Sequence, residues 1–328
     1  MSETILSVRD LKVHFPVRTG GVVFGDYTPL KAVDGISFDL KSGETLGVVG
    51  ESGCGKSTLG RAILQLVSST HGAVSWLGRD LTTQDKSAIK AARQELQVVF
   101  QDPLASLDPR MTAGDIIAEP LRNFFPEMTA AQRKARVEDI MAKVGLLPTM
   151  INRYPHEFSG GQCQRIGIAR AMILNPKLVI CDEPVSALDV SIRAQVINLL
   201  MDLQKTFNLS LIFISHDLAV VRHISHRVMV LYLGRVMELA TRDALYVSPQ
   251  HPYTKALLAA VPIPDPDKER AKPRVILTGD PPSPLNPPSG CVFRTRCPKA
   301  NDVCAQTVPT LEAIGVEHQV ACHHWRNS

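Results

Sequence analysis

The sequence has no apolar run long enough to cross a lipid bilayer. Its longest apolar runs, "LSLIFIS" and "VMVLYLG", have the length of strands, whereas a spanning helix needs about 20 apolar residues. The first ten residues include Glu3, Arg9 and Asp10 without a long apolar core, so they do not form a secretion signal. We therefore expect a soluble or peripheral protein made for the cytoplasm.

Strong charge of either sign is also missing. The net charge is only +4 over 328 residues, and no block rich in Lys or Arg stands out. A nucleic-acid-binding surface normally shows as such a block or stripe. We therefore expect no nucleic-acid partner, and the 45% apolar content is that of an ordinary globular protein.

Cysteine is sparse in most of the chain and concentrated near its end. Cys291, Cys297, Cys304 and Cys322 are separated by five, six and seventeen residues. A reducing compartment argues against disulfides, so a metal site is the first alternative. Structural zinc sites usually begin with a short C-x2–4-C pair, which is absent here. Four thiolates on looping backbone suit a [4Fe–4S] cluster, while zinc and free thiols stay open.

Two kinds of strand pattern occur. The segments "ILSVRDLKVHF" and "KAVDGISFDL" alternate apolar and polar residues, which is typical of half-buried antiparallel strands. Later segments are apolar throughout and alternate with helical patterns: "ETLGVVG", "LQVVF", "KLVICDE", "LSLIFIS" and "HRVMVLYLG". Such an alternation predicts a mainly parallel sheet covered by helices on both faces.

The order of these patterns predicts how the chain is organised. Strand signals are missing from residues 112–148, so we expect a helical subdomain over about 105–173. From Val261 onward the chain is rich in proline and loses periodicity, as linkers and extended segments do. We therefore expect a nucleotide-binding domain over 1–262 and an extension with the cysteine cluster over 263–328. The fold class is α/β, with an antiparallel β subdomain.

The segment "GESGCGKS", residues 50–57, matches the P-loop pattern. A buried strand precedes it and a helix follows, which is the context a P-loop requires. Its glycines let backbone N–H groups wrap a phosphate, Lys56 brings a positive charge, and the Ser57 hydroxyl can bind Mg²⁺. We expect ATP and Mg²⁺ here. The predicted nucleotide-binding residues are Gly50, Glu51, Ser52, Gly53, Cys54, Gly55, Lys56, Ser57 and Thr58.

Polar residues end three of the apolar segments, where the ligand crevice of an α/β sheet lies. In "LVICDEP", Asp182 can hold Mg²⁺ through its waters, and Glu183 is placed to polarise an attacking water. Gln101 follows "LQVVF" and His216 follows "LIFIS". Gln101 can contact Mg²⁺ or water, although a single Gln or His in such a place is also compatible with a purely structural role.

A second anion site is predicted at "EFSGGQCQRIGIAR", residues 157–170. Ser159 is suited to cap a helix, and Gly160 and Gly161 let backbone N–H groups face a ligand. Its presence more than a hundred residues after the P-loop raises the question of whose phosphate it binds.

In this order the motifs resemble those of the nucleotide-binding subunits of ABC transporters, over roughly residues 5–260. The matching parts are Walker A ("GESGCGKST"), the Q-loop (Gln101), the signature ("FSGGQ"), Walker B ("LVICDE"), the D-loop ("SALD", 186–189) and the switch histidine (His216). Phe158 departs from the usual Leu of the signature.

The resemblance answers the question of the second anion site. In this family two cassettes pack head to tail, and each ATP lies between the P-loop of one chain and the signature of the other. Ser159, Gly160, Gly161 and Gln162 are then expected to hold the γ-phosphate of ATP bound by a partner. Asp189 is expected near the dimer seam, and Phe15, or else Tyr27, is expected to stack on adenine. The catalytic residues are expected to be Glu183, His216 and Gln101, with Mg²⁺ held by Ser57, Gln101 and Asp182.

Further segments resemble the ATPase subunits of oligopeptide and dipeptide importers, among them "SPQHPYTKALLAAVPIPDP" and "NPPSGCVFRTRCP". The resemblance implies an ATPase at the cytoplasmic face of the inner membrane that energises oligopeptide uptake. It implies a related second ATPase subunit, two permease subunits that dock on residues 105–155, and an extracytoplasmic peptide-binding protein. Proteins like this one are reported to bind a [4Fe–4S] cluster in the tail.

Three alternatives stay open at this stage: a dipeptide importer, a soluble ABC-type ATPase that acts on ribosomes or DNA, and an exporter. Soluble translation ATPases of this class usually carry two cassettes, DNA-repair types carry long coiled coils, and exporters often fuse membrane helices. The sequence has one cassette, no heptad run and no spanning segment, which disfavours all but the peptide importers.

Overall fold

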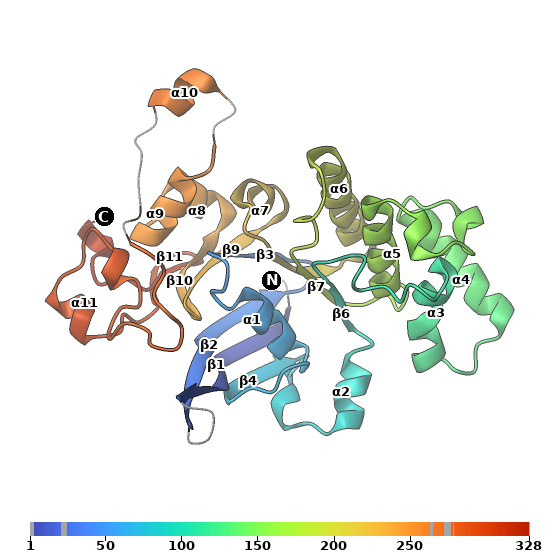
Figure 1. Ribbon diagram of the computed structural model, residues 1–328, viewed down its shortest axis with the longest axis horizontal. Helices are drawn as coiled ribbons and strands as arrows, with labels where there is room; N and C mark the ends of the chain where they lie inside the picture. The colour runs from blue at the N-terminus through green and yellow to red at the C-terminus, as the bar shows by residue number, and fades with distance from the viewer. Residues whose placement is uncertain (1–2, 21–24, 263–264, 272–276, 278, 328) are drawn as a thin grey trace. The chain divides into compact units, whose positions relative to one another are not determined.

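The computed structural model describes residues 3–20, 25–262, 265–271, 277 and 279–327 (Figure 1). The predicted domain boundary between residues 262 and 263 falls next to residues 263–264, which are outside the described residues. Contacts divide the chain into two compact units. Unit 1 consists of Met1–Ile5, Leu40–Thr45 and Thr83–Ser215, and unit 2 of Leu6–Asp39, Leu46–Thr82 and His216–Ser328. Among the described residues, no helix has the length and apolarity that a membrane span requires.

Unit 1 contains three parallel strands. β6 (Leu96–Val99) pairs with β7 (Leu178–Asp182), and β7 pairs with β8 (Ser210–Ile214). Every residue of β7 and β8 is buried. These strands are apolar on both faces because helices cover them, which confirms the predicted parallel α/β arrangement.

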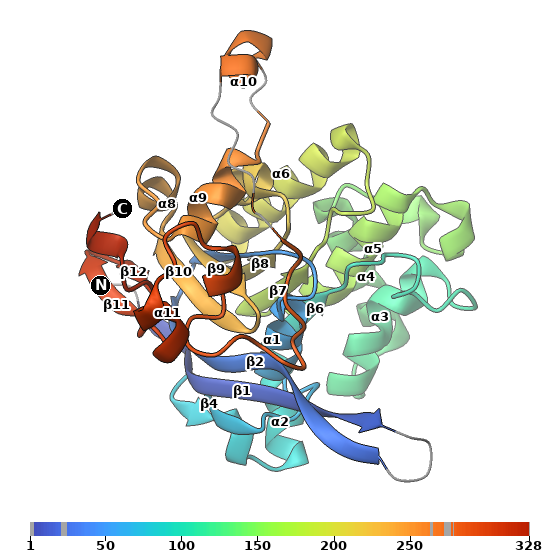
Figure 2. The ribbon, with the colours of Figure 1, turned by 60° about the vertical axis from the view of Figure 1, so that its left-hand side comes forward.

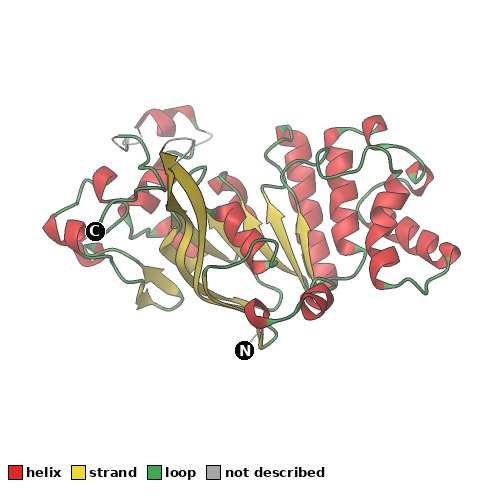
Figure 3. Ribbon diagram, turned by 60° about the horizontal axis from the view of Figure 1, so that its bottom comes forward, coloured by secondary structure: helices red, strands yellow, loops and turns green. Residues whose placement is uncertain are grey.

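Helices make up most of the rest of unit 1. They are α2 (Lys86–Ala92), α3 (Ala113–Phe124), α4 (Ala130–Lys143), α5 (Gly160–Met172) and α6 (Val190–Phe207). α3, α4 and α5 pack against one another, and no strand separates them (Figure 3). Thr112 and Thr129 cap α3 and α4 with side-chain oxygens that accept backbone N–H groups. The two helices therefore form where the strand signals are missing from the sequence.

Unit 2 contains an antiparallel sheet. Its strands are β1 (Thr4–Gly20), β2 (Gly25–Lys41), β4 (His71–Trp76) and β5 (Arg79–Asp80), in the order β2-β1-β4-β5. β4 pairs antiparallel with both β1 and β5, and β1, β2 and β4 lie side by side in Figure 2. The alternating segments predicted as half-buried strands lie in β1 and β2, which confirms the antiparallel subdomain.

A second group of strands in unit 2 joins the P-loop strand to the C-terminal extension. β3 (Thr45–Val49) pairs parallel with β9 (Arg227–Tyr232), which pairs antiparallel with β10 (Arg235–Thr241). β12 (His318–Val320) follows on β10, and β11 (Glu312–Gly315) follows on β12, both antiparallel. The sequence pattern predicts neither β10 nor the β11–β12 hairpin.

The helices of unit 2 are short. They are α1 (Lys56–Ile63), α7 (Leu218–Ile224), α8 (Arg242–Val247), α9 (Pro252–Ala259), α10 (Pro266–Ala271) and α11 (Asp302–Gln306). α1 ends earlier than its helical pattern, which continues to Val67. Gln65 shortly after its end has a φ of +53°, a left-handed conformation that stops a helix.

A buried polar cluster attaches the extension to β10. The Glu238 carboxylate, fully buried, accepts hydrogen bonds from the backbone N–H groups of Gln250 (2.8 Å) and His251 (2.9 Å), and it pairs with Nε2 of His318 on β12 (2.8 Å). His251 is buried beside it, and its Nδ1 accepts the N–H of Tyr253. Burial lowers the pKa of His251 to about 4, although the charge of Glu238 acts in the opposite direction.

The low pKa of His251 predicts that acid destabilises the protein. Its usual pKa is about 6.5, so the neutral ring stabilises the fold fully above that pH, and the contribution is lost as the pH falls from about 6.5 to 4. The loss for this one group is about 3 kcal/mol in the free energy of unfolding. Urea unfolding measured at several pH values checks it. In His251→Asn, whose Oδ1 can accept the same N–H but does not titrate, this part of the pH dependence is expected to vanish; an unchanged dependence contradicts the assignment.

Candidate functional site

The P-loop in unit 2 runs from the end of β3 to the start of α1, and two of its glycines are required by close packing. Gly50 and Gly55 have φ values of +151° and +104°. A Cβ on Gly50 would lie 2.2 Å from the carbonyl oxygen of Leu231, and one on Gly55 would lie 2.0 Å from that of Ala32. Gly53, in contrast, has no heavy atom within 4 Å of its Cβ position. The loop is therefore tightly packed at its two ends and open in its middle.

Lys56 begins α1 and is buried at 5% exposure. Its Nζ donates to the carbonyl oxygens of Gly50 (2.8 Å) and Glu51 (2.9 Å), so the ammonium lies inside the curve of the loop. α1 has Gly55 as its N-cap and no capping side chain. A helix start of this kind attracts anions through its N–H groups and its dipole. The side chain and the helix start thus supply positive charge to the same loop.

The remaining P-loop residues differ in exposure. Ser52 and Gly53 are exposed, and Ser57 and Thr58 are half-buried. Cys54 is buried, and its pKa is raised because burial outweighs the nearby Lys56 charge. Cys54 is therefore a packed thiol rather than a nucleophile.

The predicted hydrolytic residues of unit 1 come together at the carboxyl end of β7. Asp182 ends the strand and is 6% exposed. Glu183 follows with a φ of +47°, a conformation that costs a non-glycine residue about 1–3 kcal/mol. Its N–H donates to the carbonyl of Ile214, and its Oε2 accepts a 3.3 Å hydrogen bond from Nε2 of Gln101. Strain at such a position indicates that the direction of the carboxylate matters.

The signature segment forms the start of α5. Ser159 is the N-cap and completes a capping box: its Oγ accepts the N–H of Gln162, and Oε1 of Gln162 accepts the N–H of Ser159. Ser159 and Gly160 are exposed. Gly161 is buried, and a Cβ there would lie 2.3 Å from Cγ2 of Ile192 in α6. One glycine therefore faces outward and the other permits the packing of two helices.

The departure at Phe158 does not alter this exposed surface. Its side chain is 9% exposed and so belongs to the core of unit 1.

Asp189 caps α6 by accepting the N–H of Ile192 (3.0 Å). That hydrogen bond, together with one from Ser191, lowers the pKa of the exposed Asp189 carboxyl. Asp189 is thus ionised and accessible at neutral pH.

Three further predicted residues, His216, Phe15 and Tyr27, are exposed. His216 is exposed in unit 2, just before α7. Phe15 of β1 and Tyr27 of β2 are exposed at 37% and 69%, so either ring can stack on a flat ligand. Their roles stay predictions.

Two protein families match the chain. The ABC transporter family matches residues 33–186, and the family described as the oligopeptide/dipeptide transporter C-terminal region matches residues 237–304. An oligopeptide transport ATP-binding protein, OppF, of Salmonella typhimurium is 62% identical over 321 residues, which cover 98% of this chain and 96% of that protein. The chain belongs to the oligopeptide transport ATP-binding proteins of the ABC transporter family. OppF of Escherichia coli is 61% identical, with the same coverage.

Solved structures agree with this family. A dimeric ATP-binding cassette, MJ0796, in a post-hydrolysis state with ADP and Pi has a TM-score of 0.65 and 26% identity to this chain. The match covers 73% of this chain and 99% of the cassette. The fold is therefore that of an ABC ATPase, and part of the chain has no counterpart in that cassette.

The four cysteines of the extension are near one another but are not arranged as metal ligands. Burial raises the pKa of Cys291 to about 11, and the charges of Cys304, Cys297 and Cys322 contribute to the rise. Nε2 of His324 lies 3.5 Å from Sγ of Cys304, whereas His323 contacts the carbonyl of Thr307. Within the part of the chain that the structure describes, no three His, Cys, Asp or Glu side chains are positioned to hold a metal ion. The predicted cluster thus has no support beyond the proximity of the thiols.

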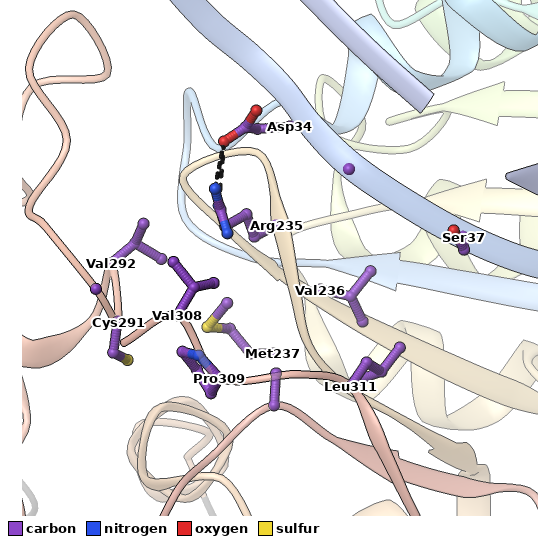
Figure 4. A pocket seen from close by; sticks show the side chains of 13 residues that line it. Asp34, Ser37, Arg235, Val236, Met237, Cys291, Val292, Val308, Pro309 and Leu311 are labelled. Carbon is purple, nitrogen blue, oxygen red and sulfur yellow. Dashed lines mark hydrogen bonds and ion pairs between the residues drawn. The ribbon is translucent and has the colours of Figure 1, made fainter. Parts of the chain in front are cut away.

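A cavity of about 150 Å³ lies between β10 and the extension, with Cys291 and Val292 on one side and Val236 and Met237 on the other (Figure 4). At its edge Arg235 donates to Asp34 at 2.7 Å. Pockets for small-molecule ligands begin at about 300 Å³. The cavity is therefore a packing gap beneath the extension rather than a ligand site of this family member.

The contrast between the two signature glycines gives a prediction. Gly161→Ala is expected to lower the free energy of unfolding by about 1–3 kcal/mol, because the new methyl group overlaps Ile192. Gly160→Ala, its matched control, is expected to change stability by less than about 0.5 kcal/mol, because only Leu188 lies near, at 3.8 Å. Thermal and urea unfolding of the two variants check this; equal effects would contradict the assigned packing.

Proposed function

We propose that the chain hydrolyses ATP and thereby energises the uptake of oligopeptides through an ABC importer. The single observation that carries this proposal is the Gln101–Glu183 contact at the end of a buried strand, in a chain that also has an open P-loop. The 62% identity to an oligopeptide transport ATP-binding protein supports the choice of transported substrate. A dipeptide importer is the alternative.

In the proposed reaction, water attacks the γ-phosphorus of ATP and the bond to the β-phosphate oxygen breaks, which yields ADP and phosphate. Glu183 accepts a proton from the attacking water, and Gln101 orients the carboxylate through its amide. Lys56 and the N–H groups of the P-loop bind the phosphates. Bound Mg²⁺ would neutralise charge on the phosphates, and Ser57, Gln101 and Asp182 are the residues proposed to hold it. His216 is proposed to contact the γ-phosphate.

The signature segment is proposed to serve the ATP of a partner subunit. Ser159 and Gly160 are exposed at the start of α5, where a phosphate can approach. The proposed partner is a second, related ATPase subunit, so that ATP joins two chains and hydrolysis lets them separate. The dimeric state of the similar cassette MJ0796 supports such an arrangement.

Glu183→Gln tests the hydrolytic assignment. Because the amide cannot accept the proton, turnover is expected to fall about a hundredfold or more, while ATP binding persists. ATP is then expected to keep the two ATPase subunits associated, which gel filtration detects. Glu3→Gln, at an exposed residue just before β1, is the matched control. Full turnover in the Glu183 variant would show that another group is the base.

The proposed location is the cytoplasmic face of the inner membrane, with two permease subunits docked on residues 105–155 and an extracytoplasmic peptide-binding protein beyond them. Purification from native membranes in mild detergent tests it. We expect permease and a second ATPase to copurify, and transport of peptides to stop when Lys56 is replaced by Ala. Recovery with ribosomes and without permease would favour the soluble ATPase instead.

We also propose that Cys291, Cys297, Cys304 and Cys322 hold a [4Fe–4S] cluster with a structural role. The support is the donor set itself, four thiols within one segment, where burial and, to a smaller extent, the other three thiols raise the pKa of Cys291. Anaerobic purification is expected to give about four irons and four sulfides per chain and a broad visible absorbance. Cys304→Ser is expected to lose the iron, while Cys163→Ser, in buried α5, is expected to keep it. A colourless protein without iron would refute the cluster; bound zinc would support the alternative.

A further inference from the structure

Glu51, the second residue of the P-loop, places an unfavourable negative charge in the proposed nucleotide site. The loop must surround a polyanion, yet it carries a carboxylate of its own. A negative charge beside a triphosphate repels it, and the repulsion is strong where water is partly excluded. Glu51 is 26% exposed, so solvent screens its charge only in part. Some positive group must compensate for Glu51 if the loop is to bind ATP tightly.

The compensating group comes from the C-terminal extension. Nη1 of Arg296 donates to both carboxylate oxygens of Glu51, at 3.0 and 2.8 Å. The Arg296 side chain is only 8% exposed. A charge-assisted pair of this kind is stronger than a neutral hydrogen bond. A residue that lies 245 positions further along the chain therefore neutralises a P-loop side chain.

Aromatic packing holds Arg296 in this position. Its guanidinium lies 5.9 Å from the ring centre of Tyr232, whose hydroxyl is 3.4 Å from Nη1. Phe293, three residues earlier in the extension, packs edge-on against Tyr232 at 5.3 Å and at a tilt against Tyr253 at 5.2 Å. All three rings are at most 1% exposed. The extension thus docks through a buried aromatic cluster that carries Arg296 with it.

A second contact acts on the backbone of the same P-loop residue. The N–H of Glu51 donates to the hydroxyl of Tyr253 in α9 at 3.0 Å, and its carbonyl accepts from Lys56. Burial raises the pKa of Tyr253, so the hydroxyl stays neutral and adds no negative charge beside the P-loop. Both Tyr253 and Arg296 lie within the C-terminal region matched at residues 237–304. That region therefore fixes Glu51 by its side chain and by its backbone.

The cost of this arrangement indicates a role other than stability. Within the described residues, Nε of Arg296 is buried without a hydrogen-bond partner. A buried ion pair is often no more stabilising than apolar residues of the same size, and an unpaired buried N–H adds a penalty. An apolar side chain at 296 would fill the aromatic cluster without that penalty.

We infer that Arg296 is a positioning residue of the nucleotide site, which neutralises Glu51 so that the P-loop accepts the triphosphate. The inference rests on the proposed ATP binding at residues 50–58. It gives the C-terminal region a task at the P-loop that is separate from any metal bound by its cysteines. Loss of the positive charge leaves a carboxylate that repels ATP most, ADP less and adenosine not at all.

Equilibrium binding to the purified full-length chain tests the inference. In Arg296→Met, the Kd for ATP is expected to rise about tenfold at low salt, the Kd for ADP less, and the Kd for adenosine not at all. The increase is expected to shrink at high salt, because salt screens the repulsion. Arg294→Met is the matched control, since Arg294 lies in the same short helical turn but donates to the carbonyl oxygen of Ser289. This control is expected to bind ATP like the parent chain.

A double variant separates charge from structure. Arg296→Met with Glu51→Gln is expected to bind ATP within about threefold of the parent chain, because the repelling carboxylate is gone. An equal loss of ATP, ADP and adenosine affinity, or no rescue by Glu51→Gln, would mean that Arg296 is only a structural support and would overturn the inference. Unchanged ATP affinity in Arg296→Met would overturn it as well.

Two further measurements of ATP binding, on Arg296→Lys and on the parent chain, complete the test. If Arg296→Met does not fold, Arg296→Lys replaces it: affinity within about threefold of the parent supports neutralisation by charge, and a tenfold loss contradicts it. The parent chain is measured first. Failure of the parent to bind ATP refutes the proposed function, whereas binding by the parent with no effect of the variants refutes only the role of Arg296.

Discussion

The nucleotide site depends on how closely backbone can approach backbone at the two ends of the P-loop. At Gly50 and Gly55 a side chain would overlap the carbonyl groups of Leu231 and Ala32. These contacts join the loop to the end of β9 and to β2, so both flanks are fixed while the middle, at Gly53, stays open. A phosphate then meets a preformed surface of N–H groups, and little order has to be created on binding.

Strand pairing places the C-terminal extension next to the P-loop. β10 continues the strand group from β9, and β12 continues it from β10, which brings the extension to the P-loop side of unit 2. The buried Glu238–His318 pair attaches β12, and the aromatic cluster around Phe293 places Arg296 on Glu51. A buried polar pair and an aromatic cluster thus hold the extension in place, and the guanidinium of Arg296 acts on the loop.

Local patterns predicted the parts of the fold that are set locally. "ETLGVVG" followed by "GKST" has one compatible structure, a buried strand, a tight loop and a helix, and the structure contains it. β10 was hidden because Leu233 and Gly234, both at positive φ, make a tight turn in a sequence that looks like one apolar segment. β11 and β12 are short and lie in a segment whose prolines and cysteines mask any alternation. Their pairing depends on β10, which no local pattern reveals.

The site shows the same division between local and distant information. Lys56, Asp182 and Glu183 could be proposed from the sequence because each lies at or shortly after the end of a buried strand. Arg296 and Tyr253 could not be predicted in this way, because no phosphate-binding motif lies near them in the sequence. Only the fold brings them to Glu51. One feature of the sequence does point to such a residue. The segment "GESG" places the Glu51 carboxylate in an anion-binding loop, which suggests a compensating cation from elsewhere in the chain.

The cap at the start of α5 leaves one hydroxyl proton available to a ligand. The hydroxyl of Ser159 accepts the N–H of Gln162, which uses a lone pair and leaves its own proton for another acceptor. Gln162 in turn satisfies the N–H of Ser159, so the capping box fixes the rotamer before any ligand arrives. Gly161 sets the depth of the helix against Ile192, and Gly160 keeps the approach open. A phosphate oxygen that reaches this surface therefore meets an ordered donor, whichever chain carries the nucleotide.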